Sequence, residues 1–202
     1  MNKSAFSMLE LVFVIVVIGI LSAVFVPRFE RDNAGEAAYQ IARHIRLAQH
    51  YALVDDKFSA TDSDWYKGMW AISFRTSHYC YAVYSNQDYA SGGTQADENE
   101  CAFDPLTKKR LYSDTGCNED TARTDDVLLW KSYGVNSINM THCGVNNQIL
   151  FDQMGRPYGS AGNLLAEDCV ITVGTDNGHS AEVTVYEETG YVKVTKIDST
   201  VL

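Results

Sequence analysis

The stretch FSMLELVFVIVVIGILSAVFV, residues 6–26, decides the expected fold because almost all of its side chains are apolar. It is 21 residues long and carries one charge, the carboxylate of Glu10. At about 1.5 Å per helical residue, it is long enough for a hydrocarbon core about 30 Å thick. A carboxylate in such a run costs free energy unless a cation accompanies it. The stretch therefore predicts a membrane-spanning helix in which Glu10 has a pairing role.

Two simpler interpretations explain less of this run. A secretory signal peptide has a shorter apolar region followed by a small-residue cleavage site, and Ser22-Ala23 is a poor version of such a site. A plain membrane anchor explains the length of the run but gives no reason for a carboxylate at Glu10.

The segment AFSMLELVFVIVVIGIL, which starts at Ala5, resembles the class III signal of type IV prepilins and pseudopilins, a small residue followed by F-T-L-x-E-L. The resemblance implies that prepilin peptidase cuts between Ala5 and Phe6 and that the new α-amine of Phe6 is methylated. It also implies that Glu10 neutralises the Phe6 amine of a neighbouring subunit during assembly. The helix glycine and proline of the family match Gly19 and Pro27. Ala5 is a departure, because the family usually has glycine before the cut.

After Pro27 the pattern becomes amphipathic, with small and apolar residues at steps of three and four: Ala34, Ala37, Ala38, Ile41, Ala42, Ile45, Ala48 and Ala52. We expect one long helix from about Ser7 to about Leu53, with a kink near Pro27 and this stripe packed on a sheet. The expected organisation is a leader (1–5), a transmembrane and assembly helix (6–27), its amphipathic continuation (28–57) and a β-rich periplasmic head (58–202).

Short β-like runs alternate with turns in the head: Met69–Phe74, His78–Tyr84, Val127–Ser132, Gln148–Phe151, Cys169–Val173, Glu182–Tyr186 and Val192–Thr195. The expected fold class is α+β, a long N-terminal helix, transmembrane in its first half, packed on a C-terminal antiparallel β-rich head. A Gly155-Arg156-Pro157 turn is expected, because glycine permits a positive φ and proline fixes the next one. The segments 149–160 and 169–194 resemble the end of H-type pseudopilin and FimT-like minor pilin heads.

All five cysteines lie after the apolar run, and none forms a C-x-x-C pair. Outside the cytoplasm, disulfides are the default for such cysteines. Pairing of nearest neighbours predicts Cys101–Cys117, which would tie the long polar loop of about 85–126, and Cys143–Cys169. Cys80 is then left over, although the sequence does not fix the connectivity.

The net charge of −10 disfavours nucleic acid as a partner. The tight basic cluster Lys108-Lys109-Arg110 is typical of a solvated loop. No cofactor or metal is expected. Calcium is the alternative that the loop acids leave open, because they are oxygen donors without EF-hand spacing: Asp88, Asp97, Glu98, Glu100 and Asp104.

The sequence carries no G-x-S-x-G, P-loop or H-E-x-x-H motif, so an enzyme is not expected. His78 with Cys80, and His142 with Cys143, could suggest zinc or a nucleophilic pair. His142 and Cys143 are adjacent in an expected strand and would point apart, and an oxidising compartment favours disulfides instead. The aromatic clusters leave a ligand-binding surface as an alternative to strand packing: Trp65, Tyr66 and Trp70, then Tyr79, Tyr81 and Tyr84.

The expected function is that of a structural minor subunit of a type IV pilus or a type II secretion pseudopilus. Its expected partners are other pilin subunits, prepilin peptidase, the inner-membrane assembly platform and the lipid bilayer. The expected location is the bacterial inner membrane with the head in the periplasm. Three alternatives stay open: a major pilin, a DNA-capturing FimT-like tip pilin, and an anchored periplasmic domain that never polymerises.

Overall fold

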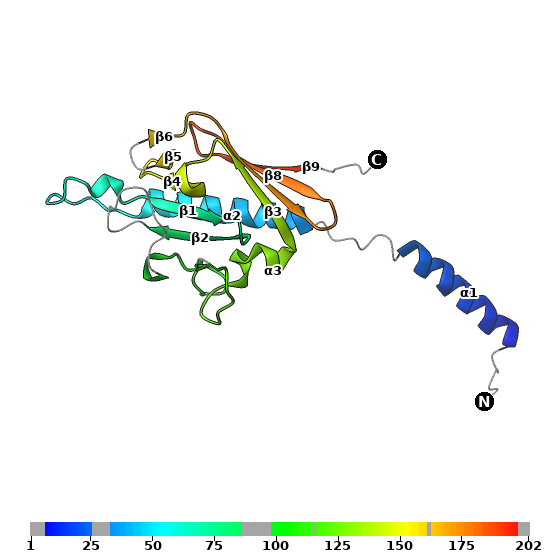
Figure 1. The fold of residues 1–202 in the computed structure, drawn as a ribbon. Coiled ribbons are helices and arrows are strands. Elements are labelled where there is room, and N and C mark those ends of the chain that lie inside the picture. Colours follow the sequence, from blue (N-terminus) through cyan, green and yellow to red (C-terminus); the bar gives the residue numbers. More distant parts are fainter. Residues whose placement is uncertain (1–6, 26–32, 86–97, 115, 161–162, 198–202) are drawn as a thin grey trace. The chain divides into compact units, whose positions relative to one another are not determined.

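The computed structural model of the chain describes residues 7–25, 33–85, 98–114, 116–160 and 163–197 (Figure 1). The chain divides into two compact units, Met1–Asp32 and Asn33–Leu202. The described part of the first unit is built on one helix, α1 (Met8–Phe25). The second unit, the head, holds α2 (Asn33–Val54) and every strand of the described chain.

The expected single long helix with a transmembrane first half is wrong. The described chain has two separate helices, α1 of 18 residues and α2 of 22 residues. An 18-residue helix is about 27 Å long, which is shorter than a hydrocarbon core of about 30 Å. Within the described residues, no helix combines the length and apolarity needed to cross a membrane. Residues 26–32, which include Pro27 and the expected kink, lie outside the described residues.

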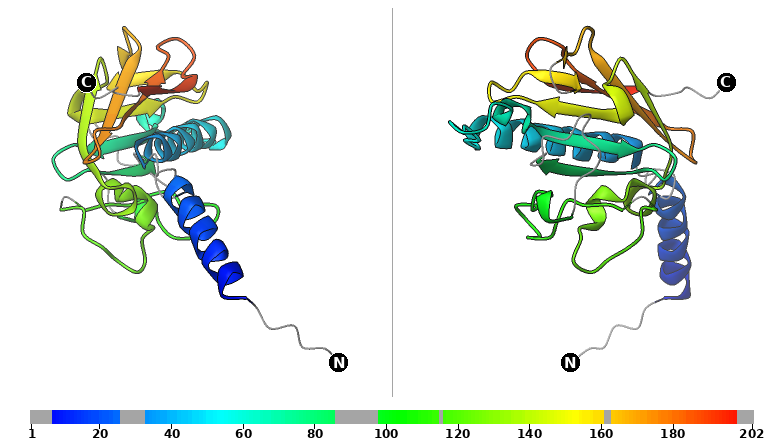
Figure 2. Two further views of the ribbon diagram at one scale, coloured as in Figure 1. Left: turned by 90° about the vertical axis from the view of Figure 1, so that its right-hand side faces the viewer. Right: turned by 60° about the vertical axis from the view of Figure 1, so that its left-hand side comes forward.

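The head contains two antiparallel sheets (Figures 1 and 2). The five-stranded sheet has the order β2-β1-β4-β5-β6, with strands Cys80–Ser85, Trp70–Arg75, Gln148–Phe151, Pro157–Ser160 and Asn163–Leu164. The four-stranded sheet has the order β3-β7-β8-β9, with strands Val135–Thr141, Cys169–Thr175, Ser180–Val185 and Val192–Ile197. The mixture of helix and antiparallel sheet is therefore as expected, and Gln148–Phe151 has the predicted bounds.

The strand expected at Val127–Ser132 is wrong, because this segment is helical. It contains the short helices η4 (Asp125–Val127) and α3 (Leu129–Tyr133). The Thr124 side chain accepts a hydrogen bond from the Asp126 N–H at the start of η4, and Gly134, with a φ of 65°, ends α3. The three other short helices of the described chain are η2 (Trp65–Lys67), η3 (Glu98–Glu100) and η5 (Val145–Asn147).

The predicted stripe of α2 is confirmed as the centre of the hydrophobic core. Its members are between 0 and 5 % exposed: Ala34, Ala37, Ala38, Ile41, Ala42, Ile45, Ala48 and Ala52. α2 packs against strands of both sheets, including β1 and β8. The expected turn after β4 is also confirmed: Gly155 has a φ of 75° and its N–H donates to the Asp152 carbonyl at 2.9 Å.

One buried polar residue, His44, interrupts the apolar face of α2. Its side chain is 0 % exposed, and its Nδ1 lies 2.6 Å from the Tyr81 hydroxyl on β2. The Tyr81 hydroxyl also donates to the Asp126 carbonyl at 3.3 Å. Burial, followed by the nearby Arg43 charge, lowers the pKa of His44 from 6.5 to about 4.

The disulfide pattern confirms one predicted pair and corrects the other. Cys143 is bonded to Cys169 as expected, with Cα atoms 4.5 Å apart. The predicted Cys101–Cys117 pair is wrong, because Cys117 is bonded to Cys80, the cysteine that was expected to be left over. Cys101 is buried and belongs to neither bond.

The packing of the five-stranded sheet explains this correction. Cys80 and Cys117 belong to the core that includes α2, whereas Cys101 packs with Tyr84 and Leu150 in a separate cluster. Cys101 is bridged to Tyr84 near the end of β2, whereas Cys80, the partner of Cys117, is the first residue of that strand, about 13 Å away at about 3.3 Å per residue. Sequence proximity along the loop therefore does not bring Cys101 to Cys117.

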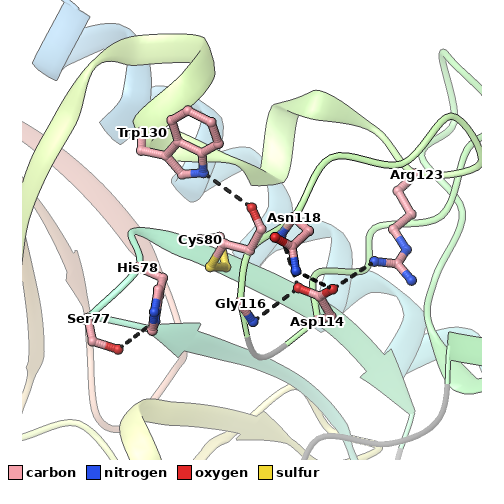
Figure 3. The surroundings of a disulfide bond; sticks show 9 residues. Ser77, His78, Cys80, Asp114, Gly116, Asn118, Arg123 and Trp130 are labelled. Atoms are coloured by element: carbon pink, nitrogen blue, oxygen red, sulfur yellow. Dashed lines mark hydrogen bonds and ion pairs between the residues drawn. A yellow bond between two sulfur atoms is a disulfide. The ribbon is translucent and has the colours of Figure 1, made fainter.

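The polar loop that follows β2 is fixed to the edge of that strand. The Ala102 N–H donates to the Val83 carbonyl, and the Val83 N–H donates to the Leu111 carbonyl, both at 2.9 Å. Beside the Cys80–Cys117 bond, an oxygen of Asp114 accepts hydrogen bonds from the N–H groups of Gly116 and Asn118 at 3.1 and 3.0 Å (Figure 3). The described loop is thus ordered by backbone pairing as well as by the disulfide.

Non-reducing peptide mapping should find Cys80 linked to Cys117 and Cys143 linked to Cys169. A Cys101→Ser variant should keep both bonds. Replacing Cys80 and Cys117 together by serine should lower the free energy of unfolding by roughly 2–4 kcal/mol, because the unfolded chain regains loop entropy. A peptide that links Cys101 to Cys117 would contradict the described pairing.

The free energy of unfolding should fall by roughly 3 kcal/mol as the pH is lowered from about 7 to about 4, through His44 alone. The sign follows from the lowered pKa: the unfolded imidazole takes up a proton near pH 6.5, whereas the folded one resists until about pH 4. Urea unfolding at several pH values would measure this loss. A His44→Met variant should show a flatter pH dependence, whereas His50→Met, at an exposed position on the same helix, should keep the slope; equal slopes in both variants would refute the assignment.

Candidate assembly site

Within its own unit, α1 offers an apolar surface that the other described residues of that unit do not cover. Every described side chain from Ser7 to Ser22 is exposed. The large apolar ones range from 38 % exposure at Val17 to 85 % at Met8. Burying one such side chain contributes roughly 1.5–3 kcal/mol, so this helix has a strong tendency to be buried in an apolar surrounding.

Glu10 lies in the first turn of α1, where it combines two features. It is the acidic residue of that turn, and its N–H donates to the Ser7 side-chain oxygen at 3.3 Å and to the Ser7 carbonyl at 3.1 Å. Ser7 thus acts as the N-cap, and the Ser7-x-x-Glu10 spacing is that of a capping box. The negative carboxylate is also favoured by the positive end of the helix dipole.

The other residues predicted for the assembly site are only partly placed. Ala5, Phe6 and Pro27 lie outside the described residues. Gly19 lies inside α1, and a Cβ atom built on it would meet nothing within 4 Å. The described residues therefore give no steric reason for glycine at this position.

The acids named for calcium are not brought together. Asp88 and Asp97 lie outside the described residues. The Asp104 carboxylate accepts from Thr107 and Leu106 and pairs with Arg43, and Glu98 pairs with Arg123. Among the described residues, no group of three or more His, Cys, Asp or Glu side chains is arranged to hold a metal ion.

The two His–Cys pairs, His78 with Cys80 and His142 with Cys143, do not form a metal or nucleophilic site. Cys80 and Cys143 are both disulfide-bonded. The expectation that His142 lies within a strand is wrong: it follows β3 with a φ of 56°, and its Nδ1 lies 3.1 Å from Glu167. His78 lies in the turn before β2, and its Nδ1 is 2.9 Å from the Ser77 hydroxyl (Figure 3).

The structure divides the aromatic residues into two groups with different environments. Trp65, Tyr66 and Trp70 line a pocket of about 290 Å³ at the C-terminal end of α2. Tyr81 and Tyr84 are fully buried on β2, whereas Tyr79 has a φ of 57° and lies in the turn before it, not in the expected strand. Sequence reasoning did not identify this pocket, because its lining comes from segments 52–58, 65–70 and 151–153.

The comparisons with known proteins do not identify a family: no family model, curated protein or solved structure matches the chain. The function proposed below therefore depends on the residues of this chain and on their arrangement.

The cap and the charge of the first turn of α1 should be separable by mutation. Ser7→Ala should speed hydrogen exchange of the Glu10 amide about fivefold, because losing an N-cap costs about 1 kcal/mol of helix stability. Hydrogen exchange of the full chain in detergent micelles would measure the effect. Glu10→Gln should change exchange little, since glutamine also serves in a capping box; unchanged exchange in Ser7→Ala would refute the capping role.

Proposed function

We propose that the chain is a non-enzymatic filament subunit of the type IV pilin and pseudopilin class, serving as a minor subunit of a pilus or of a type II secretion pseudopilus. In this proposal, prepilin peptidase removes residues 1–5 and the new terminus at Phe6 is methylated. The α1 helices of successive subunits then pack against one another, and each subunit carries its own head. The membrane location and the assembly-platform partner named above stay predictions.

The observation that carries the proposal is an apolar helix with exposed side chains and one carboxylate in its first turn. The large apolar side chains of α1 are between 38 and 85 % exposed, and any apolar surrounding, lipid or protein, would bury them favourably. Lipid alone would leave the Glu10 carboxylate without a cation, which is costly. A bundle of processed helices supplies that cation, because each new subunit contributes an α-amine at Phe6.

The rest of the described chain is consistent with a structural role. The head has its own core around α2 and two disulfides, the pattern of a domain that matures outside the cytoplasm. Two of its fully buried polar side chains, His44 and Asp104, are hydrogen-bonded to Tyr81 and Thr107 and are therefore used in holding the fold.

Processing can be tested on filaments sheared from the native cell. The N-terminal peptide in mass spectrometry should begin at methylated Phe6, at a few copies per filament if the subunit is minor. The same peptide in dominant amount would indicate the major subunit instead. An intact Met1 terminus that never enters filaments would refute the proposal.

The pairing role of Glu10 can be tested by neutral substitution. Glu10→Gln should reduce the amount of the chain in filaments by more than about tenfold, since removing one partner of a buried ion pair costs roughly 3–5 kcal/mol. The substitution keeps the capping geometry, so the helix itself should form. Glu36→Gln, at an exposed acid of α2, is the matched control and should enter filaments at the normal level. Equal incorporation of both variants would contradict the pairing role.

A further inference from the structure

The head presents one unusually exposed apolar side chain, Leu106, on a rigid turn. Leu106 is 74 % exposed, the highest value of any large hydrophobic residue in the described head. It lies in the segment 103–109, which we call the Leu106 turn. The Asp104 N–H donates to the Lys109 carbonyl at 2.8 Å, and the Lys108 N–H donates to the Asp104 carbonyl at 3.0 Å, so the two ends of this turn are joined.

The Asp104 carboxylate holds the interior of the turn. It is buried, it accepts hydrogen bonds from the Leu106 and Thr107 N–H groups at 3.3 and 2.9 Å, and the Thr107 hydroxyl donates to it at 2.6 Å. Arg43 of α2 pairs with the same carboxylate at 3.2 Å. Burial raises the pKa of Asp104, but these hydrogen bonds and the Arg43 charge outweigh it and hold the pKa below its ordinary value. Leu106 is thus presented on a preorganised support.

The pocket at the end of α2, here called the aromatic pocket, is equally well fixed. The Trp70 ring stacks on Tyr51 with centroids 4.7 Å apart, and its Nε1–H donates to Asp55 at 2.8 Å. Phe58 packs edge-on against Trp65 with ring centroids 5.3 Å apart. The aromatic pocket has a volume of about 290 Å³, which is at the small end of the range for ligand pockets and suits one or two side chains.

The charges around the two features are opposite. The segment 52–70, which supplies most of the pocket lining, carries four aspartates and two lysines. Lys57 pairs with Asp55 at 3.7 Å and Lys67 with Asp64 at 2.9 Å, so the segment has a net charge of −2 that comes from Asp56 and Asp62. The last turn of α2 contains no basic residue, and the cation among the described pocket-lining residues, Lys57, lies beside Asp55. The Leu106 turn carries Lys108 and Lys109, which are exposed and form no ion pair with any described residue.

The chain does not satisfy this complementarity within itself. Both features lie beside Tyr51, whose ring stacks on Trp70 and whose hydroxyl donates to the Phe103 carbonyl at 3.4 Å. Leu106 nevertheless points into solvent rather than into the pocket, as its exposure shows. An apolar side chain flanked by two lysines, and an apolar pocket beside aspartates on the same molecule, match each other between two copies.

We propose that the Leu106 turn of one copy inserts into the aromatic pocket of a second copy, with Lys108 and Lys109 beside the aspartates of segment 52–70. The contact joins two different surfaces. In the filament proposed above, where all subunits have the same polarity, it is therefore heterologous and can repeat from copy to copy. Only the repetition of the contact along a filament depends on the proposed function. The contact between two heads needs neither leader cleavage nor Glu10.

The test uses the full chain with the photo-crosslinker p-benzoylphenylalanine in place of Leu106. Labelled (¹⁵N) and unlabelled copies are produced in separate cultures, extracted into mild detergent, mixed and irradiated, and the crosslinks are identified by mass spectrometry. Crosslinks between a labelled and an unlabelled copy should join position 106 to peptides of 52–70 or 151–153. The same photo-crosslinker at Trp130, which is 41 % exposed on α3, should not give this product.

Charge reversal provides the second arm of the test. Lys109→Glu should lower the yield of the crosslink about tenfold, because it places an acid beside the pocket aspartates, and Asp56→Lys in the second copy should restore it. Lys193→Glu, at an exposed position on β9, is the matched control and should leave the yield unchanged. Melting temperature and intact disulfides confirm that each variant is folded.

The outcomes separate this inference from the proposed function. Filaments that begin at methylated Phe6 but give no crosslink from position 106 to the pocket overturn the inference alone. The expected crosslink in a chain that keeps Met1 supports the inference and overturns the proposed function. Crosslinks to a different protein, or a yield that charge reversal leaves unchanged, overturn the choice of a second copy as the occupant.

Discussion

The packing of α2 against both sheets is the constraint on which the rest of the head depends. Alanine fills most of the contact positions, so the backbones of helix and strands approach closely, and each sheet covers part of the same narrow stripe. A larger side chain at Ala38 or Ala42 would have to displace neighbouring core atoms, because both positions are 0 % exposed. The two sheets are therefore one folding unit although they share no strand pairing.

The same helix positions the polar features of the head. Arg43 reaches the Asp104 carboxylate and His44 contacts Tyr81, so two neighbouring residues of α2 connect the helix to the loop and to β2. Gln49 donates to the Gly155 carbonyl at 2.8 Å and Arg46 to the Val192 carbonyl at 2.8 Å. In this way one helix is hydrogen-bonded to the β4–β5 turn of one sheet and to the start of β9 in the other.

Sequence reasoning was accurate where a repeating pattern determines the structure. The three- and four-residue spacing of alanine identified the buried face of α2, and Gly155 identified a turn that requires a positive φ. It was wrong at Val127–Ser132, because a short apolar run fits a helix or a strand equally well. Within the assembly site it found Glu10 as the lone charge, but it missed the Ser7 cap that the S-x-x-E spacing indicates. The aromatic pocket and the Cys80–Cys117 bond join segments that are distant in sequence, so no local pattern could reveal them.

The placement of the two disulfides has a mechanical consequence for a protein whose chain is under tension. The bonds join cysteines 37 and 26 positions apart, and the two closed loops do not overlap along the chain. Residues inside a closed loop cannot contribute length when the polypeptide is stretched. At about 3.5 Å per residue, the two loops withhold roughly 200 Å of extension. A head under tension would therefore lengthen much less than its residue count allows, and β4, β5 and β6, which lie within the second loop, are shielded from the load.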